Sequence, residues 1–112
     1  MISNQVLQTT LDGLKAITRV DLTVLDPEGK EVATTLSAKA TLAIKNAKDF
    51  TVGPADSQEI QGYQYFKVFD DANVEYILIA YGVGEDVYMV GKMVAFQLQS
   101  LVVAYKERFD KD

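Results

Sequence analysis

The chain contains no cysteine and no histidine. Without cysteine there is no disulfide, no thiolate nucleophile and no cysteine metal site, and without histidine the commonest metal ligand and general base is missing. An enzyme built from this sequence would depend on Asp, Glu, Lys or Tyr, and these residues form no recognisable catalytic constellation. We therefore predict that the protein is not an enzyme, with no catalytic residues, no cofactor and no metal site.

Long apolar runs and an excess of positive charge are also missing. No run of about eighteen apolar residues occurs, and the N-terminus has no basic region followed by an apolar core and a small-residue cleavage site. These features predict a cytoplasmic protein without a membrane partner. The chain has 11 Lys and Arg against 16 Asp and Glu, a net charge of −5 that repels a polyanion. Direct DNA binding by this domain is therefore not expected.

What remains is an ordinary globular composition, with 112 residues, 48% hydrophobic and 24% charged. This length suits one domain spanning residues 1–112. Ser3 is a candidate N-cap, and apolar residues at three- and four-residue spacing predict a helix to about Ile17. The strand-like segments 20–24 and 31–35 flank the turn sequence of residues 26–29, which predicts a hairpin.

The rest of the chain predicts a second helix, two more strands and a long last helix. Helix formers run from Ser37 to about Ala47, strand formers fill residues 63–69 and 74–81, and helical character extends over 86–109. The predicted class is α+β, in the order α-β-β-α-β-β-α, with room for one more strand near Phe50 or Ile60. We expect an antiparallel sheet of four or five strands, with the first and last helices against one face and the second helix near the other.

The last helix is apolar on almost every side, and one sheet cannot cover all of this apolar surface. One row of its residues repeats at spacings of four and three, which is typical of a helix that pairs with another helix. A second apolar row lies beside it and widens this surface. A helix buried inside one domain is the alternative interpretation. We predict a homodimer interface at Gly91, Val94, Ala95, Leu98, Leu101, Val102, Tyr105 and Phe109. This helix ends without a glycine cap or a proline stop, so we also expect the natural chain to continue.

The aromatic strands offer a candidate ligand site. Half of their side chains must face the core, and the others could line a pocket for a small polar ligand, although cross-strand aromatic pairs are equally ordinary. A lysine near such a pocket could hold a carboxylate. The candidate ligand-binding residues are Tyr63, Tyr65, Lys67, Tyr81 and Lys39.

Several segments together are similar to a known family. They are residues 4–8, 13–22, 24–30, 57–68, 86–92 and 101–110, including Gly13-Leu14-Lys15-Ala16-Ile17-Thr18-Arg19-Val20-Asp21-Leu22 and Leu101-Val102-Val103-Ala104-Tyr105-Lys106-Glu107-Arg108-Phe109-Asp110. Over nearly its whole length the chain resembles the N-terminal sensory domain of bacterial transcription regulators of the sugar-diacid (CdaR-type) and purine-catabolism (PucR-type) family. The resemblance rests on general similarity and not on a catalytic signature.

The resemblance implies a PAS-like or GAF-like sensory domain of a cytoplasmic homodimer. We expect the fold to be PAS-like or profilin-like. It implies that a small carboxylate or related metabolite is sensed, and that a helix-turn-helix beyond this chain contacts DNA. The ligand state would then reach that DNA-binding domain through the last helix. The alternative function is a ligand-free dimerisation or scaffold module.

Overall fold

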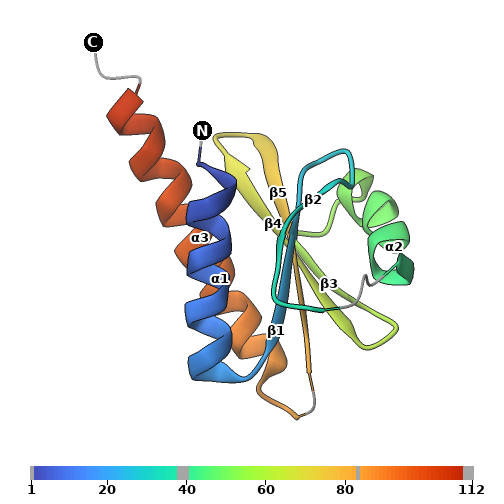
Figure 1. Cartoon of the computed structure of the whole chain (residues 1–112). Coiled ribbons are helices and arrows are strands. Elements are labelled where there is room, and N and C mark those ends of the chain that lie inside the picture. Colours follow the sequence, from blue (N-terminus) through green and yellow to red (C-terminus); the bar gives the residue numbers. More distant parts are fainter. Residues whose placement is uncertain (1, 38–40, 83, 110–112) are drawn as a thin grey trace.

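The computed structural model describes residues 2–37, 41–82 and 84–109 of the chain and shows three layers (Figure 1). A sheet forms the middle layer, with α1 and α3 on one face and α2 on the other. The elements are α1 (Asn4–Thr18), β1 (Asp21–Leu25), β2 (Glu31–Thr34), α2 (Thr41–Val52), β3 (Ser57–Ile60), β4 (Tyr63–Asp70), β5 (Asn73–Tyr81) and α3 (Val87–Phe109). The α+β class and the antiparallel sheet are confirmed.

The sheet has five strands in the order β2-β1-β5-β4-β3, and all neighbouring pairs are antiparallel. The element order is therefore α-β-β-α-β-β-β-α. The additional strand for which the predicted order left room lies at Ile60, as β3, and not at Phe50, which belongs to α2. This edge strand is short, and its first three residues are polar and exposed, so it gives little apolar signal. Its turn to β4 is made by Gln61 and Gly62, which both have positive φ, as a two-residue hairpin turn requires.

Local interactions define the ends of α1. Ser3 is the N-cap, as predicted, and its Oγ accepts a hydrogen bond from the Val6 N–H at 3.1 Å. At the other end, Arg19 adopts a left-handed conformation with φ of 61°, and its N–H donates to the Lys15 carbonyl. The helix therefore ends two residues before β1 and turns the chain directly into the sheet.

The second helix lies further along the chain than the sequence predicted. It was expected from Ser37 to about Ala47, whereas α2 spans Thr41–Val52, and residues 38–40 lie outside the described part of the chain. Ala43, Ala47 and Phe50 form its buried face. The predicted run of helix formers ended at about Ala47, but Lys48 and Asp49 lie on the exposed side of a helix whose apolar face continues to Phe50.

The sheet separates two hydrophobic clusters, which confirms the predicted placement of the helices. On the α1 and α3 face, Leu7 and Leu11 of α1 join Val94, Leu98 and Val102 of α3 in one cluster over the central strands. On the opposite face, the buried residues of α2 cover a second cluster containing Leu25, Tyr65, Ile77 and Ile79. Strands β1, β4 and β5 contribute to both clusters, so the middle of the sheet is buried on both sides.

Two glutamine side chains connect the α1 and α3 face to strand backbone. Gln99 of α3 donates to the Phe69 carbonyl at 2.6 Å and accepts from the Phe69 N–H at 2.8 Å. Phe69 follows an irregularity in the β4–β5 pairing, where the side chain replaces a strand partner. Gln8 of α1 makes the same pair of bonds to Thr34 of β2. Each helix is thus held in register along the sheet.

Candidate functional site

The predicted ligand-binding residues of β4 and β5 lie on the α2 face of the sheet. Tyr63, Tyr65 and Lys67 are alternate residues of β4 and therefore share this face. Tyr81 of β5 joins them, because its ring meets the Tyr63 ring edge-on with centroids 5.0 Å apart. Its hydroxyl lies 3.2 Å from the Thr23 hydroxyl. The structure thus brings four of the five predicted residues together, while Lys39 lies outside the described residues.

Tyr65 and Lys67 use their polar groups to hold α2 against the sheet. The Tyr65 hydroxyl donates to the Ala43 carbonyl in α2 at 2.7 Å. The Lys67 ammonium donates to the Gly53 carbonyl just beyond α2 and lies 5.2 Å from the centre of the Phe50 ring. Two alternate residues of β4 are therefore bonded to the backbone at both ends of α2. A group that competes for these bonds would loosen the helix from the sheet.

Burial raises the pKa of the Tyr65 hydroxyl above the ordinary tyrosine value. Desolvation raises its pKa to about 12, and the nearby Tyr63 adds to the increase. An unfolded tyrosine has a pKa of about 10, so the folded chain binds this proton more tightly than the unfolded chain. The resulting stabilisation is complete below pH 10 and is lost as the pH rises through the folded pKa of about 12.

We predict that Tyr65→Phe lowers the free energy of unfolding at pH 7 by about 1–3 kcal/mol, because the Ala43 carbonyl loses its buried donor. Urea unfolding followed by circular dichroism measures this loss. Between pH 10 and pH 12 the difference between wild type and variant should narrow, since only the wild type can ionise Tyr65. Tyr88→Phe, at an exposed tyrosine, is the matched control. A difference that stays constant across this pH range would contradict the assignment.

The predicted dimer seam on α3 faces the chain's own sheet. Gly91, Val94, Leu98 and Val102 are buried in the cluster between α3 and the strands, so in this conformation they are covered by the chain itself. Ala95, Leu101 and Tyr105 pack partly against the same cluster. Phe109 is the last residue of α3, and its side chain lies outside the described atoms. The seam is therefore the core side of α3.

A second apolar row lies on the opposite side of α3. Met89, Met93, Phe96 and Val103 are exposed to 61%, 64%, 73% and 47%. Ser100 continues the row, which repeats at spacings of four, three, four and three residues. At about 3.6 residues per turn, this spacing keeps the row on one face, about half a turn from Leu98. We call Met89, Met93, Phe96, Ser100 and Val103 the outer row of α3.

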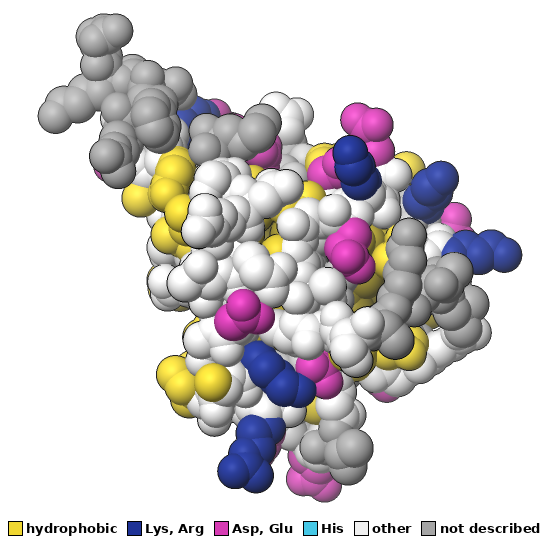
Figure 2. Space-filling view, in the orientation of Figure 1, with side chains coloured by type: hydrophobic (Ala, Val, Ile, Leu, Met, Phe, Trp, Pro, Cys, Tyr) yellow, Lys and Arg dark blue, Asp and Glu magenta, His cyan; other side chains and the backbone are white. Residues whose placement is uncertain are grey.

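The outer row belongs to an apolar surface that the domain leaves uncovered. Figure 2 shows hydrophobic side chains gathered at the upper left, where α3 extends beyond α1 and the sheet in Figure 1. Large exposed apolar patches on proteins mark interaction surfaces. A four-three repeat is the spacing with which one helix packs against another. The outer row is therefore a candidate helix-pairing surface. It lies on the face of α3 opposite the one predicted from the sequence.

By length and composition, α3 could also cross a membrane over Val87–Glu107, where mean hydropathy reaches 1.4. A core helix of a soluble domain satisfies the same test. Here Val94, Leu98 and Val102 complete the core against the sheet, so moving α3 into lipid would expose the strands that it covers. The fold thus uses one side of α3 as core.

β4 connects the α2 face to α3 through adjacent residues. Tyr65 points to α2, and its neighbour Phe66 points to α3, since successive strand residues face opposite sides. The Phe66 ring lies so close to Gly91 that a Cβ there would come within 2.5 Å of it. The same ring is 5.7 Å from that of Tyr88. A displacement of β4 at Tyr65 would therefore reach α3 through a close-packed contact.

A scan of the chain against protein-family models gave no match, and searches of curated proteins and of solved structures gave none either. The family resemblance therefore stays a prediction.

Proposed function

We propose that the chain is a PAS-like regulatory domain that senses a small molecule and pairs with a second copy through the outer row of α3. The observation that carries the proposal is this row of large apolar side chains, exposed on the helix face opposite the core. Pairing two such rows removes apolar surface from water, worth about 25 cal/mol per Å² before the cost of association. This function agrees with the CdaR/PucR-type resemblance.

The proposed sensing site is the α2 face of β4 and β5. Tyr65 and Lys67 donate to main-chain carbonyls at the two ends of α2, and both are groups that a carboxylate could recruit. A small carboxylate between the sheet and α2 would exchange these contacts for its own. The tyrosine pair Tyr63 and Tyr81 would form the aromatic wall of the site.

The proposed signal is a shift between two packings of α3. Ligand contact at Tyr65 would displace β4. The close contact between Phe66 and Gly91 would transmit this displacement to α3 and favour one of its two packings. Because a second copy packs along the same helix, a small rotation of α3 would change the pairing of the outer rows. In the regulators that the chain resembles, such a change would alter the geometry of the DNA-binding domains that follow.

The experiment is a thermal-shift screen of the purified chain against small carboxylates, sugar acids and purine catabolites. A ligand that binds only the folded state must raise the melting temperature. We expect a dose-dependent increase for one chemical class in the wild type and a much smaller one in Lys67→Met, which keeps the apolar stem but loses the ammonium. Lys48→Met, which removes an exposed ammonium from α2, is the matched control.

The competing function is a ligand-free dimerisation module, in which the tyrosine pair and the α2 contacts are only structural. It predicts no shift in melting temperature at millimolar concentrations of any compound in a sample that is folded and dimeric. That result would reject the sensing part of the proposal and leave the pairing surface intact.

A further inference from the structure

The two edges of the sheet differ in how they are covered. At the β2 edge, the Gln8 amide bonds to the N–H and the carbonyl of Thr34, at 3.1 and 2.7 Å, where a neighbouring strand would otherwise pair. The other edge is β3 (Figure 1). Within the described part of the chain, no group outside β4 bonds to the backbone of β3. Another strand could therefore be added at the β3 edge.

Two residues of β3 direct their main-chain groups away from the sheet. The Lys67 N–H donates to the Asp56 carbonyl at 2.9 Å, so these two residues form a hydrogen-bonded pair. Hydrogen-bonded and non-bonded pairs alternate along an antiparallel ladder. Ser57 and Glu59 are therefore at non-bonded positions opposite β4. Their N–H and carbonyl groups point outward, where they are open to water or to another extended backbone.

A hollow of about 350 Å³ lies beside this edge, between β3, β4 and α3. Ser57 and Phe66 line it from the sheet, and Ala95, Phe96 and Gln99 line it from α3. The β3 residue paired with Phe66 is a serine, whose small side chain leaves this space open. Ligand pockets in proteins begin at about this volume. A side chain from an added strand could therefore enter between β3 and α3.

The pairing of an added strand determines which of its side chains enters the hollow. Directly opposite residues of two antiparallel strands place their side chains on the same face. Ser57 lies on the α3 face with its partner Phe66, so a residue opposite Ser57 also points to this face and into the hollow. The walls there are Phe66, Ala95 and Phe96. A large apolar side chain therefore suits the position opposite Ser57.

The charges near the edge select a second residue. A strand antiparallel to β3 passes Glu59 two residues before it reaches Ser57. Within the described part of the chain, the Glu59 and Asp56 carboxylates form no ion pair. The Lys92 ammonium, at the rim of the hollow, lies over the Tyr88 ring. A basic residue opposite Glu59 would form a favourable cross-strand pair, and an acidic one would be repelled.

We propose that the β3 edge binds an extended peptide segment of a partner protein by strand addition. The segment runs antiparallel to β3, with a basic residue opposite Glu59 and, two positions later, a large apolar residue opposite Ser57. The outward N–H and carbonyl groups of Ser57 and Glu59 bond to its main chain, while the apolar side chain fills the hollow beside α3. This surface lies on the other side of the sheet from the sensing site proposed above.

The test is a titration of the full chain with the peptide acetyl-Thr-Thr-Lys-Thr-Leu-Thr-Thr-amide at constant ionic strength, followed by ¹H–¹⁵N correlation spectra. We expect saturable shifts at the amides of Ser57 and Glu59, with a dissociation constant on the order of 1 mM. The peptide with glutamate in place of lysine should bind at least about 5-fold more weakly. No saturable shift at about 10 mM peptide, or equal binding of both peptides, would overturn the proposal. Shifts that depend on the concentration of the chain alone would place a second copy at this edge and would also overturn it.

Backbone methylation of the peptide separates strand addition from apolar contact. N-methylation of the leucine removes the N–H that bonds to the Ser57 carbonyl and should raise the dissociation constant at least about 10-fold. N-methylation of the threonine just before it, whose N–H faces away from β3, is the matched control and should change the constant less than about 3-fold. Equal weakening by the two methyl groups would reject strand addition.

A charge reversal in the chain tests the role of Glu59. Glu59→Lys should make the chain prefer the glutamate peptide over the lysine peptide. Glu28→Lys makes the same change in the exposed β1–β2 turn and should keep the wild-type preference. If both variants change the preference equally, the peptide responds only to the net charge of the chain, and the proposed pairing with Glu59 is wrong.

Discussion

A chain carrying Met93→Glu and Phe96→Glu is expected to be a folded monomer at concentrations where the proposed pairing makes the wild-type chain a dimer. Both side chains are mostly exposed in the single chain, at 64% and 73%, so their replacement removes little core packing. In a pair of outer rows they would lie at the centre, where buried, unpaired carboxylates are strongly unfavourable. We expect the dimer dissociation constant to rise at least about 100-fold, equivalent to about 2.7 kcal/mol.

Sedimentation velocity measures this change, and circular dichroism checks the fold. Val52→Glu with Gln58→Glu adds the same two negative charges at exposed positions of α2 and β3, away from α3, and should leave the proposed dimer intact. If the Met93 and Phe96 variant stays dimeric with an unchanged constant, the outer row is not the pairing surface.

The second large effect is expected at Leu98, on the opposite side of the same helix. This side chain is fully buried among the strands, with 0% exposure. Leu98→Glu would remove a core leucine and place a carboxylate in an apolar cluster with no cation to pair with. We expect a loss of more than about 4 kcal/mol, a large part of the total stability of a domain of this size.

Thermal and urea unfolding measure the loss, and Gln97→Glu supplies the control. Gln97 is the exposed neighbour of Leu98 in α3, and its replacement makes the same change in charge. It should cost less than about 0.5 kcal/mol. A Leu98→Glu chain that is folded, stable and monomeric would reverse the assignment of the two faces, because Leu98 would then belong to the interface.

The two faces of α3 show why its orientation could not be predicted from the sequence. Leu98 and Phe96 both belong to rows with the same four-three spacing, and apart from Ser100 both rows are apolar. A periodic pattern identifies the buried side of a helix only when the other side is polar. The position of Gly91 against the Phe66 ring decides the orientation, and that contact joins residues far apart in the chain.

Elements with a strong local signal were predicted well. Ser3 has the side-chain chemistry of an N-cap, and the alternation and turn residues around Asp26 belong to a hairpin that the structure contains. Strand β3 could be predicted only as one of two possible extra strands, because Ser57, Gln58 and Glu59 are polar residues at an exposed sheet edge. Their strand conformation comes from pairing with β4 and not from their own preference.

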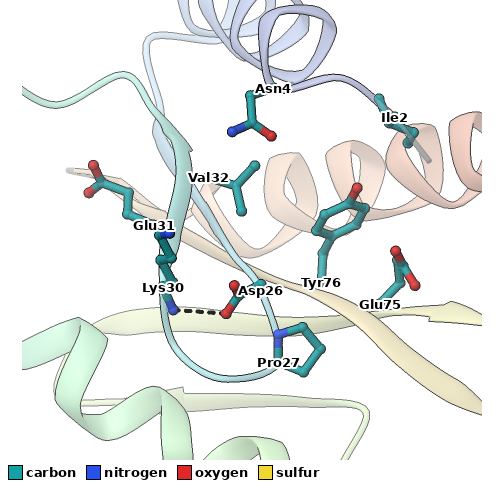
Figure 3. A pocket seen from close by; sticks show the side chains of 9 residues that line it. All are labelled: Ile2, Asn4, Asp26, Pro27, Lys30, Glu31, Val32, Glu75 and Tyr76. Atoms are coloured by element: carbon teal, nitrogen blue, oxygen red, sulfur yellow. Dashed lines mark hydrogen bonds between the residues drawn. The ribbon is translucent and has the colours of Figure 1, made fainter.

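The α2 face and the opposite face of the sheet differ in how far the sequence reveals them. Tyr63, Tyr65 and Lys67 alternate along one strand, so a common face could be predicted from spacing alone. A hollow beside Tyr76 (Figure 3) is formed by the start of α1, a turn and β5, which no local pattern brings together.

The most direct test of the proposed pairing is disulfide cross-linking at Ser100. The chain has no cysteine, so Ser100→Cys introduces a single thiol, at an exposed position within the outer row. In a parallel pair this position meets its own counterpart, close to the Cα separation of about 4.4–6.8 Å that a disulfide needs. Ala72→Cys, in the exposed β4–β5 turn, is the control for random collision.

Under mild oxidation at micromolar concentration, we predict rapid and nearly complete formation of a covalent dimer by Ser100→Cys and little by Ala72→Cys. Cross-linking of Ser100→Cys no faster than that of Ala72→Cys, in samples that sedimentation shows to be folded dimers, would contradict parallel pairing through the outer row of α3.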